Sequence, residues 1–443
     1  MNDLKIPKIR FAQYTDSWVL TPLSGLVASV DSGWSPQCDH GVAAEGEWGV
    51  LKTTSVQWTG FESDKNKKLP QALEPRENLS LREDDILVTR AGPNERVGVV
   101  SRVDRDYPKL MLSDKIIRLR TKTGTNPNYL ALSLSLKKNN YQIMSKASGL
   151  ATSQTNISQK FLLQTRLGIP TLPEQQKIAS FLSKVDEKIG LLSEKKDKLA
   201  EYKRGVMQQL FNGKWHEQDG QLTFVPPTLR FKADDGSEFP DWEEKKVSDC
   251  FEFFTTNSLS RDKLSYTSGE VKNIHYGDIH TKFRTVFLVT QERVPSIAEA
   301  VDTKKIKAQS YCQDGDLAFA DASEDYADIG KCIEIRGLGD IKLVSGLHTH
   351  LARPKEKFAL GYQAYLQKSW KMRYQIMRIA QGTKVLGIST KQLAKIDVPI
   401  PCYDEQEKIA SFMMSLDSKI ELLNSELNKA KEWKRGLLQQ MFV

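Results

Sequence analysis

The sequence predicts an α/β (α+β) chain made of two copies of one unit, in which a globular domain precedes a long helix. The strongest observation is an internal repeat: Glu174 to Phe211 aligns without gaps onto Glu405 to Phe442, with 20 identities in 38 positions. The second is that short β-like runs broken by turns precede each repeated segment, with helical stretches near residues 127–146 and 358–380.

The repeat continues upstream in shorter pieces. The Tyr-Gln-Ile-Met segment 141–144 returns at 374–377, and Asp85-Ile86-Leu87 resembles Asp316-Leu317-Ala318. Near the two starts, Trp18 matches Trp242. The duplication therefore covers the globular domains as well as the helices. We expect domains at 1–160 and 241–391, helical segments at 170–212 and 400–443, and a linker at 213–240 that is rich in Gly, Pro, Asp and Glu.

Within the globular domains, β-branched and other apolar runs predict strands. The expected strands are Ile86–Thr89, Val97–Val100, Ile116–Leu119, Leu317–Ala320 and Ile333–Ile335.

Each repeated segment carries an apolar seam with a 4-3 spacing, which is the coiled-coil pattern. The first seam is Ile178, Leu182, Val185, Ile189, Leu192, Lys196, Leu199, Lys203, Val206 and Leu210. The second is Ile409, Met413, Leu416, Ile420, Leu423, Leu427, Ala430, Lys434, Leu437 and Met441. At 1.5 Å per residue, 38 helical residues extend about 57 Å.

The helix ends and two seam lysines suggest further features. Glu174 and Glu405 are acidic residues suited to helix N-termini, and Asn212-Gly213 is a plausible stop. Lys203 and Lys434 occupy the same seam position in the two helices. Such a lysine can fix helix register, or it can simply extend its ammonium group to solvent. The sequence leaves both readings open.

Composition excludes several protein classes. Of 443 residues, 39% are hydrophobic and 27% are charged, which is typical of folded chains and unlike disordered ones. Neither an apolar run of membrane-spanning length nor a signal-peptide core is present, so we expect a cytoplasmic protein with no membrane partner. Five scattered cysteines predict neither a disulfide framework nor a zinc site. The net charge of +8 permits a nucleic-acid partner, and the long helices account for only +2 of it.

Catalytic motifs are absent or incomplete. The chain lacks a phosphate loop, a dinucleotide loop and the common hydrolase motifs. Asn126-Pro127-Asn128-Tyr129 matches only part of an adenine methyltransferase loop, and Pro240-Asp241 with Glu243-Glu244-Lys245 compresses a nuclease motif whose halves belong on separate strands. His348 and His350 lack an acidic or cysteine partner at metal-ligand spacing, so structural or DNA-facing roles are favoured.

The repeated residues are similar to a known family. The pattern I-P-x-x-x-E-Q-x-K-I-A-x-F, followed by a heptad helix ending K-R-G-x-x-Q-Q-x-F, occurs twice. It resembles the DNA specificity subunit of type I restriction–modification systems. The resemblance implies two target recognition domains that each read half of a split DNA sequence. It also implies an antiparallel coiled coil with pseudo-two-fold symmetry, and a chain that catalyses nothing itself.

The resemblance further implies partners and cofactors. These are double-stranded DNA, two methylation subunits that carry S-adenosylmethionine, and two restriction subunits that can join, bringing ATP-driven chemistry and magnesium. This chain itself would bind no cofactor and no metal. The partner subunits are expected to dock on the seam helices, at Ile178, Leu182, Val185, Ile189, Leu192, Leu199, Ile409, Leu416, Ile420, Leu423, Leu427 and Leu437.

Polar loop residues are the candidates for DNA contact, because such side chains read base edges and bind phosphates. In the first domain they are Ser35, Gln37, Thr53, Thr54, Thr89, Arg90, Asn94, Arg96, Thr152, Ser153, Gln154 and Asn156. In the second they are Asn257, Ser258, Arg261, Lys263, His275, Tyr276, Asp278, His280, Thr281, Asp321, Ser323 and Lys384. Trp34 and Trp58 could pack on bases, but core packing is the favoured interpretation.

Two other functions compete with DNA reading. One is a single-chain methyltransferase or nuclease with unrecognised motifs, which activity of the purified chain alone would reveal. The other is a coiled-coil scaffold that binds only protein, which sequence-selective DNA binding would exclude.

Overall fold

The computed structural model describes residues 6–38, 41–148, 155–211, 214–218, 221–225, 227 and 229–443. It divides into two compact units, of which the first is Met1–Ser193 with Ser425–Val443 and the second is Glu194–Asn424. Both long helices, α5 (Leu172–Phe211) and α11 (Tyr403–Gln440), therefore contribute one half to each unit. In the described part of the chain, no helix is long and apolar enough to cross a membrane.

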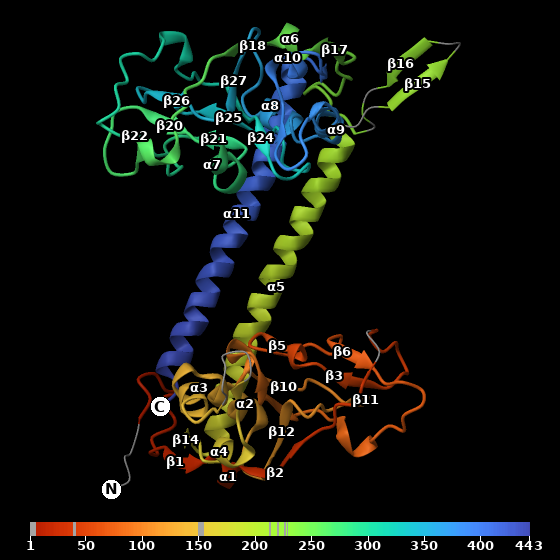
Figure 1. Ribbon diagram of the computed structural model, residues 1–443, viewed down its shortest axis with the longest axis vertical. Helices are drawn as coiled ribbons and strands as arrows, with labels where there is room; N and C mark the ends of the chain where they lie inside the picture. Colours follow the sequence, from red (N-terminus) through yellow and green to blue (C-terminus); the bar gives the residue numbers. More distant parts are fainter. Residues whose placement is uncertain are drawn as a thin grey trace. The chain divides into compact units, whose positions relative to one another are not determined.

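The first unit holds a mixed domain before α5 (Figure 1). Its helices are α1 (Leu23–Leu26), α2 (Pro127–Ser135), α3 (Lys137–Met144) and α4 (Gln159–Leu163). Its strands are β1 (Val19–Pro22), β2 (Val27–Ser32), β3 (Gly49–Leu51), β4 (Val56–Gln57), β5 (Gly60–Phe61), β6 (Asn66–Lys68), β7 (Ser80–Leu81), β8 (Ile86–Thr89), β9 (Ala91–Gly92), β10 (Val100–Arg102), β11 (Tyr107–Met111), β12 (Ile116–Thr121), β13 (Thr155–Asn156) and β14 (Arg166–Ile169).

The second unit repeats this plan. Its helices are α6 (Val247–Cys250), α7 (Tyr276–Thr281), α8 (Tyr362–Leu366), α9 (Trp370–Ile379) and α10 (Thr390–Leu393). Its strands are β17 (Glu243–Lys246), β18 (Phe251–Phe254), β19 (Leu264–Ser265), β20 (Lys272–Ile274), β21 (Val286–Leu288), β22 (Ser296–Ile297), β23 (Leu317–Ala320), β24 (Ala322–Ser323), β25 (Cys332–Arg336), β26 (Leu343–Ser345), β27 (Thr349–Pro354), β28 (Leu386–Gly387) and β29 (Asp397–Ile400).

Sheet topology confirms the duplication. The order β10-β8-β12-β2 in the first unit matches β25-β23-β27-β18 in the second, where β21 adds a fifth strand. The second sheet of each unit contains one parallel pair, β3 with β11 and β20 with β26. Small pairs recur as well, because β1 pairs with β14 as β17 pairs with β29, and β9 pairs with β13 as β24 pairs with β28. The predicted mixed class is therefore confirmed.

The same buried ion pair starts both long helices. Glu174 accepts hydrogen bonds from Arg10 at 2.7 Å and from the indole of Trp18 at 3.4 Å. Glu405 receives Arg230 at 2.7 Å and the indole of Trp242 at 3.0 Å. Both carboxylates are fully buried. Each glutamate therefore ties the start of its helix to the start of its own globular domain, which the helix-dipole argument alone did not predict.

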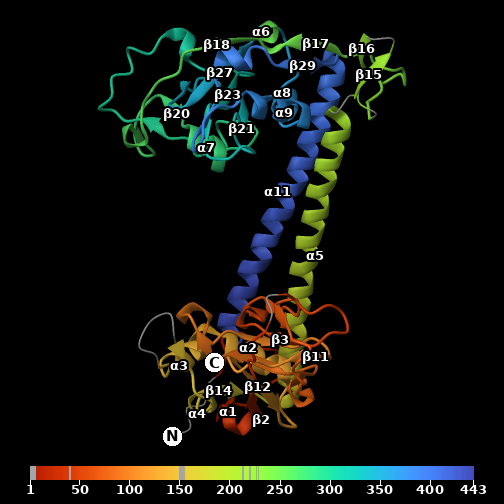
Figure 2. The same cartoon turned by 45° about the vertical axis from the view of Figure 1, so that its right-hand side comes forward.

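Each core also receives the end of the other copy's helix. In the first unit, Phe442 stacks on Tyr129 with ring centroids 5.3 Å apart and lies edge-on to Trp18 at 6.3 Å. In the second unit, Phe211 contacts the matching rings: it is tilted against Tyr362 at 5.9 Å and lies edge-on to Trp242 at 6.5 Å. Figures 1 and 2 both place α2 and α3 beside the C-terminal end of α11. Both units thus need helix segments from both repeats.

The predicted seam lies on the buried side of the helices. All 20 seam positions are buried or half-buried. Lys203 pairs with Asp417 on the facing helix, and Lys434 pairs with Asp186 at 2.5 Å. Because 186 and 417, like 203 and 434, differ by the repeat offset, one cross-helix ion pair occurs once in each unit. This geometry favours the interpretation that the two lysines fix the register of the helices, rather than simply extending into solvent.

One local prediction differs from the structure. Val97–Val99 is a turn after a 3-10 helix, and the strand begins only at Val100, because Gly98 adopts a positive φ of 77°. The expected linker contains a hairpin of β15 (Lys214–Gln218) and β16 (Gln221–Val225), which was not predicted from the sequence. The proposed stop at Asn212-Gly213 lies outside the described residues.

Candidate nucleic-acid interface

In the second unit, α7 gathers several of the predicted DNA-contacting side chains. His275 caps this helix, and its Nδ1 accepts a backbone hydrogen bond at 3.1 Å. Asp278 in the first turn is fully buried and receives two hydrogen bonds from Arg261, at 2.7 and 3.0 Å, and one from Lys282 at 2.8 Å. Asp278 therefore holds two exposed cations in place instead of facing a ligand itself.

An aromatic and histidine cluster lies next to these cations. The Tyr276 ring centroid is 4.8 Å from His275, 5.3 Å from His348 and 6.2 Å from His280. His348 is half-exposed, and its Nδ1 lies 3.2 Å from a carboxylate oxygen of Asp321. Its backbone φ of 55° is unusual for a residue other than glycine.

Charge and burial set the protonation states in this cluster. Burial, assisted by the Arg261 charge, lowers the pKa of His275, so this ring is neutral at pH 7. Burial alone would raise the pKa of Asp278, but hydrogen bonds from Arg261 and Lys282 outweigh it and lower the pKa. The cluster thus combines two cations, a neutral imidazole and a tyrosine ring.

Strand pairing brings three more predicted residues to the same side of the domain. β24 pairs with β28 through Ala322 opposite Gly387, and His280 hydrogen-bonds the Ala322 carbonyl at 3.0 Å. Asp321 and Ser323 flank Ala322, and Lys384 is exposed in the turn before β28. The structure therefore groups His275, Tyr276, Asp278, His280, Asp321, Ser323, Lys384 and Arg261 around α7 and the β24–β28 pair.

The other four second-domain candidates differ in whether their side chains are free to contact DNA. The Asn257 amide is used internally, because it donates to Asn273 at 2.7 Å and to the Ser345 carbonyl at 3.2 Å. Ser258 and Lys263 are exposed on the loop that carries Arg261. Thr281 donates its hydroxyl hydrogen back to α7.

In the first unit, Arg96 is the centre of a loop junction. Its guanidinium donates to the carbonyls of Thr53 and Val56 at 2.7 and 2.8 Å and to the Gln57 side chain at 2.9 Å. Thr89 is fully buried, donates to the Arg96 carbonyl and accepts from a backbone N–H. Arg96 and Thr89 therefore shape the surface that carries Thr53, while Thr54 is exposed on it.

A basic hollow opens beside this junction. A cavity of about 230 Å³ is lined by the predicted Ser35 and Thr53 together with Lys52, Lys67 and Lys115. Ser35 hydrogen-bonds Asp114 at its rim, and Gln37 is exposed nearby in sequence. A hollow lined by three lysines suits a phosphate group.

The remaining first-domain candidates lie on another strand pair. β13 pairs with β9, which sets the exposed Asn156 opposite Ala91. Asn94 is exposed, and Thr155 contacts its side chain at 3.4 Å. The half-buried Arg90 reaches Ser32 at 3.5 Å. Thr152, Ser153 and Gln154 lie outside the described residues.

The two tryptophans behave differently from each other. Trp34 packs against the buried cluster of the second sheet, with the Arg76 guanidinium 4.1 Å above its ring. Trp58 is 49% exposed at the tip of the β4–β5 hairpin, so the core interpretation is wrong for it. A two-residue tip between short strands has no second layer to cover an indole, and the ring lies next in sequence to Gln57 of the loop junction.

Two residues of the weak catalytic and metal motifs have structural roles. Asn126 caps α2 by accepting a hydrogen bond from the Tyr129 N–H at 2.9 Å. His350 Nε2 lies 2.9 Å from the Ile388 carbonyl oxygen, which gives this ring a structural role. Over the described residues, no group of three His, Cys, Asp or Glu side chains could hold a metal ion.

Sequence reasoning missed several residues of these surfaces. Lys52, Gln57, Lys67 and Lys115 come from separate segments of the first unit and come together only after folding. In the second unit, Lys282 joins Arg261 at Asp278 only in the folded domain. A lysine in a loop has no local pattern that distinguishes it from other solvated lysines. His348 was noted, but only the fold reveals its contact with Tyr276.

A family model fits both copies of the unit. The model described as the type I restriction modification DNA specificity domain matches residues 51–201 and again residues 240–432. The EcoEI specificity subunit of Escherichia coli is 39% identical over 165 residues, which cover 37% of this chain and 28% of that protein. The MjaVIII specificity subunit of Methanocaldococcus jannaschii is 23% identical over 375 residues, covering 82% of this chain and 80% of that protein.

Solved structures share the fold. An S subunit of a type I restriction–modification system from M. genitalium aligns with a TM-score of 0.56 and 14% identity, covering 99% of both chains. A chain from a study of assembly and conformational transition in the type I R-M system aligns with a TM-score of 0.54 and 12% identity, covering 97% of this chain and 99% of that one. At these identities the likeness concerns the fold alone.

Proposed function

The chain belongs to the type I restriction–modification DNA specificity family, and from this premise we propose that it reads a split DNA target, one half with each globular domain. The observation that carries the proposal is that both units keep the same buried connections but present different surfaces. The Glu174 and Glu405 networks are equivalent. The candidate DNA-contacting surfaces of the two units are not equivalent, because one presents a lysine-lined hollow and the other a tyrosine–histidine cluster.

The chemistry of these surfaces suits a duplex. Arg261 and Lys282 are held as exposed cations that can meet phosphates, while Tyr276, Ser323 and Lys384 carry groups that can contact base edges. In the first unit, the hollow lined by lysines supplies phosphate contacts, and Thr54 and Asn156 supply side chains for bases. Because these faces differ, the target should be asymmetric.

The catalytic work would lie on partner subunits. We assign two methylation subunits to the seam helices, one for each repeat, with S-adenosylmethionine bound to them. Restriction subunits, with ATP and magnesium, would complete a cleaving complex. The repeated helices support this assignment, because equal surfaces on two repeats suit a partner present in two copies.

Mapping adenine methylation tests the proposal. DNA would be sequenced with single-molecule detection from cells that co-express this chain with its methylation subunit, and from cells that lack this chain. We expect methylation at one split, asymmetric motif, with one adenine on each strand. Methylation that persists without this chain, or that follows no split motif, would contradict DNA reading by it. A stable complex without any methylation would favour the scaffold alternative.

A further inference from the structure

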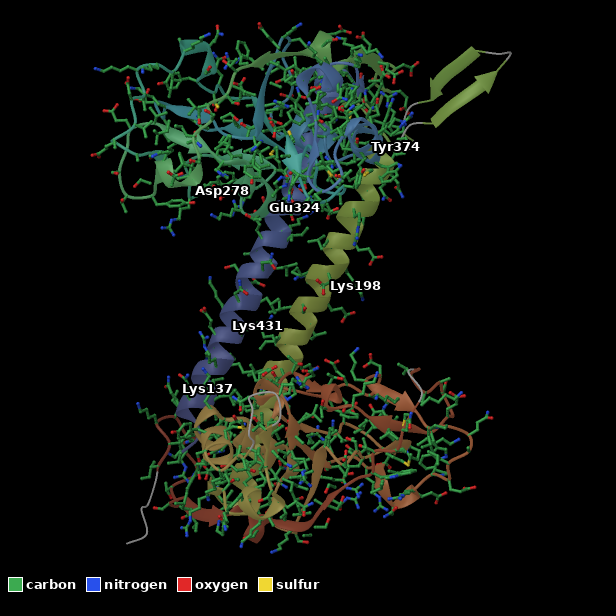
Figure 3. The ribbon with its side chains drawn as sticks, viewed as in Figure 1. Lys137, Lys198, Asp278, Glu324, Tyr374 and Lys431 are labelled. Atoms are coloured by element: carbon green, nitrogen blue, oxygen red, sulfur yellow. The ribbon has the colours of Figure 1, made fainter. Side chains whose placement is uncertain are left out.

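The second unit contains a cavity that DNA reading does not use. Its volume is about 490 Å³, which is within the range of small-molecule sites. Helices α5, α7, α8 and α11 and strands β21 and β25 all contribute lining residues, and every one of these residues belongs to the second unit. Figure 3 shows Asp278, on α7, at the lower edge of the second globular domain, and the next residue, Ile279, lines the cavity. We call this space the α7 cavity.

The lining of the α7 cavity combines apolar and charged side chains. Phe283, Val286 and Met414 are among its apolar residues. Its charged residues are Lys203, Arg284, Lys331, Lys368, Asp417 and Glu421. Four cations therefore face two carboxylates, so the lining carries an excess of positive charge.

Both carboxylates of the lining are already bound by neighbouring side chains. Lys203 pairs with Asp417, whose other oxygen accepts a hydrogen bond from the Tyr365 hydroxyl at 2.7 Å. Arg284 pairs with Glu421 at 2.9 Å. Neither carboxylate is thus left to balance a further cation.

Lys368 is the cation of this lining that lacks a partner. Lys331 donates to the His280 carbonyl at 2.6 Å, whereas the half-buried Lys368 ammonium makes no hydrogen bond or ion pair with any residue that the structure describes. Burial, assisted by the Lys203 charge, lowers the pKa of Lys368 to about 8, so the group is still mostly charged at pH 7. A partly buried ammonium group without a counter-charge is unfavourable.

The first unit shows that the fold does not require this lysine. The offset that relates α3 to α9 matches Lys368 with Ser135, which carries no charge. The cross-helix ion pair of this region is nevertheless retained in the first unit, as Lys434 with Asp186. The ion pair therefore belongs to the shared architecture, and the unpaired lysine is an addition of the second unit alone.

We infer that the α7 cavity binds a small organic anion, in which one carboxylate, sulfonate or phosphate group pairs with Lys368 and an apolar body packs against Phe283, Val286 and Met414. One unpaired cation suits one anionic group, and the apolar residues favour a ligand larger than an inorganic ion. The backbone of a DNA duplex offers phosphates but no apolar body to fill the cavity. The site is distinct from the Tyr276 cluster, because neither Tyr276 nor His348 lines it.

The test uses two fluorescent probes that differ in one charged group. Anilinonaphthalene sulfonate is an aromatic anion, and phenylnaphthylamine is its uncharged analogue. Each probe is titrated into the full-length wild-type chain, into Lys368→Gln and into Lys368→Arg. We expect Lys368→Gln to weaken binding of the sulfonate about tenfold, because a charged hydrogen bond is lost, and to leave binding of the uncharged probe unchanged. Lys368→Arg keeps the charge and should bind both probes as wild type does.

A matched control separates this site from general surface charge. Lys342 is an exposed lysine of the second unit that does not line the cavity, so Lys342→Gln should bind both probes normally. Thermal unfolding checks that each variant is folded, and Lys368→Gln should be at least as stable as wild type because it removes an unpaired charge.

Four results would overturn the inference. They are a wild-type chain that does not bind the sulfonate, equal sulfonate affinity in wild type and Lys368→Gln, an equal loss in Lys342→Gln, and an equal loss of both probes in Lys368→Gln. Weaker binding of duplex DNA by Lys368→Gln, with sulfonate affinity unchanged, would make this lysine a nucleic-acid contact instead. Probe binding is measured without DNA or partner subunits, so its outcome is independent of the proposed function.

Discussion

At the scale of single residues, the second core contains two amides that the first core lacks. Gln363 and Gln367 on and after α8 are 1% and 4% exposed, and neither side chain has a hydrogen-bond partner among the described residues. The matching positions of the first unit are Leu130 and Leu134, both fully buried. A buried polar group without a partner costs about 1–3 kcal/mol, so the second unit is less stable than its topology allows.

Replacing these amides should stabilise the second unit. We expect Gln363→Leu and Gln367→Leu each to raise the free energy of unfolding by about 1–2 kcal/mol, measured by urea denaturation. Leu130→Gln is the matched control and should lower it. A loss of stability in the leucine variants would mean that the amides have a partner, such as internal water.

A second residue-scale prediction concerns pH. Burial raises the pKa of Glu334 to about 7, even though it accepts hydrogen bonds from the backbone of Gly361 and Ala364. The folded state therefore prefers the protonated carboxyl. Its stabilising effect is complete below about pH 4.5, the value for an exposed glutamate, and is lost as the pH rises through about 7.

Glu334→Gln should remove this dependence. The free energy of unfolding would be measured for the variant and for wild type at each pH. The variant's value relative to that of wild type should be about 1–3 kcal/mol higher at pH 8 than at pH 4.5. Urea midpoints measured across this range provide the check. A constant difference would show that Glu334 ionises normally in the folded protein.

At the scale of the elements, the repeated cross-helix ion pair should control helix register. Lys203→Asp places a second carboxylate opposite that of Asp417. The repulsion between them should destabilise the second unit by about 1–3 kcal/mol. Adding Asp417→Lys restores opposite charges and should recover most of the loss. Hydrogen exchange of the α5 and α11 amides would measure both the loss and the recovery of stability. If the double variant is as unstable as the single one, the pair does not act as a unit.

The apolar seam should matter for assembly but not for base choice. Leu423 is 6% exposed, so Leu423→Asp should disrupt helix pairing and reduce binding of the methylation subunit. Leu192→Asp is the matched change in the other helix. Complexes that still form should methylate the same motif as wild type. A changed motif would mean that the helices take part in reading bases.

At the scale of the whole molecule, much of the architecture was predictable because duplication exposes it. A segment that recurs at a fixed offset shows where the repeated unit begins and ends. A 4-3 apolar seam predicts a helix that pairs with another helix. Strands such as β8 and β23 follow directly from buried apolar runs. The turn at Val97–Val99 was misassigned, because a glycine with positive φ breaks an otherwise strand-like run.

The candidate DNA-contacting residues were less predictable for a physical reason. Sequence distinguishes polar from apolar loops, but it does not distinguish a side chain that supports a loop from one that the loop presents. Arg96 and Asn257 belong to the first kind, because their side chains donate hydrogen bonds to backbone carbonyls. The basic hollow and the Tyr276 cluster exist only because distant segments meet in the folded domain.

The central claim is that each unit reads its own half of the target, and an exchange of one globular domain tests it most directly. Residues 1–160 would be replaced by the corresponding domain of another family member. Adenine methylation would then be mapped in cells that co-express the methylation subunit. The account predicts a new motif in which one half is changed, while the other half and the gap between them are retained. A change in both halves, or in neither, would contradict it.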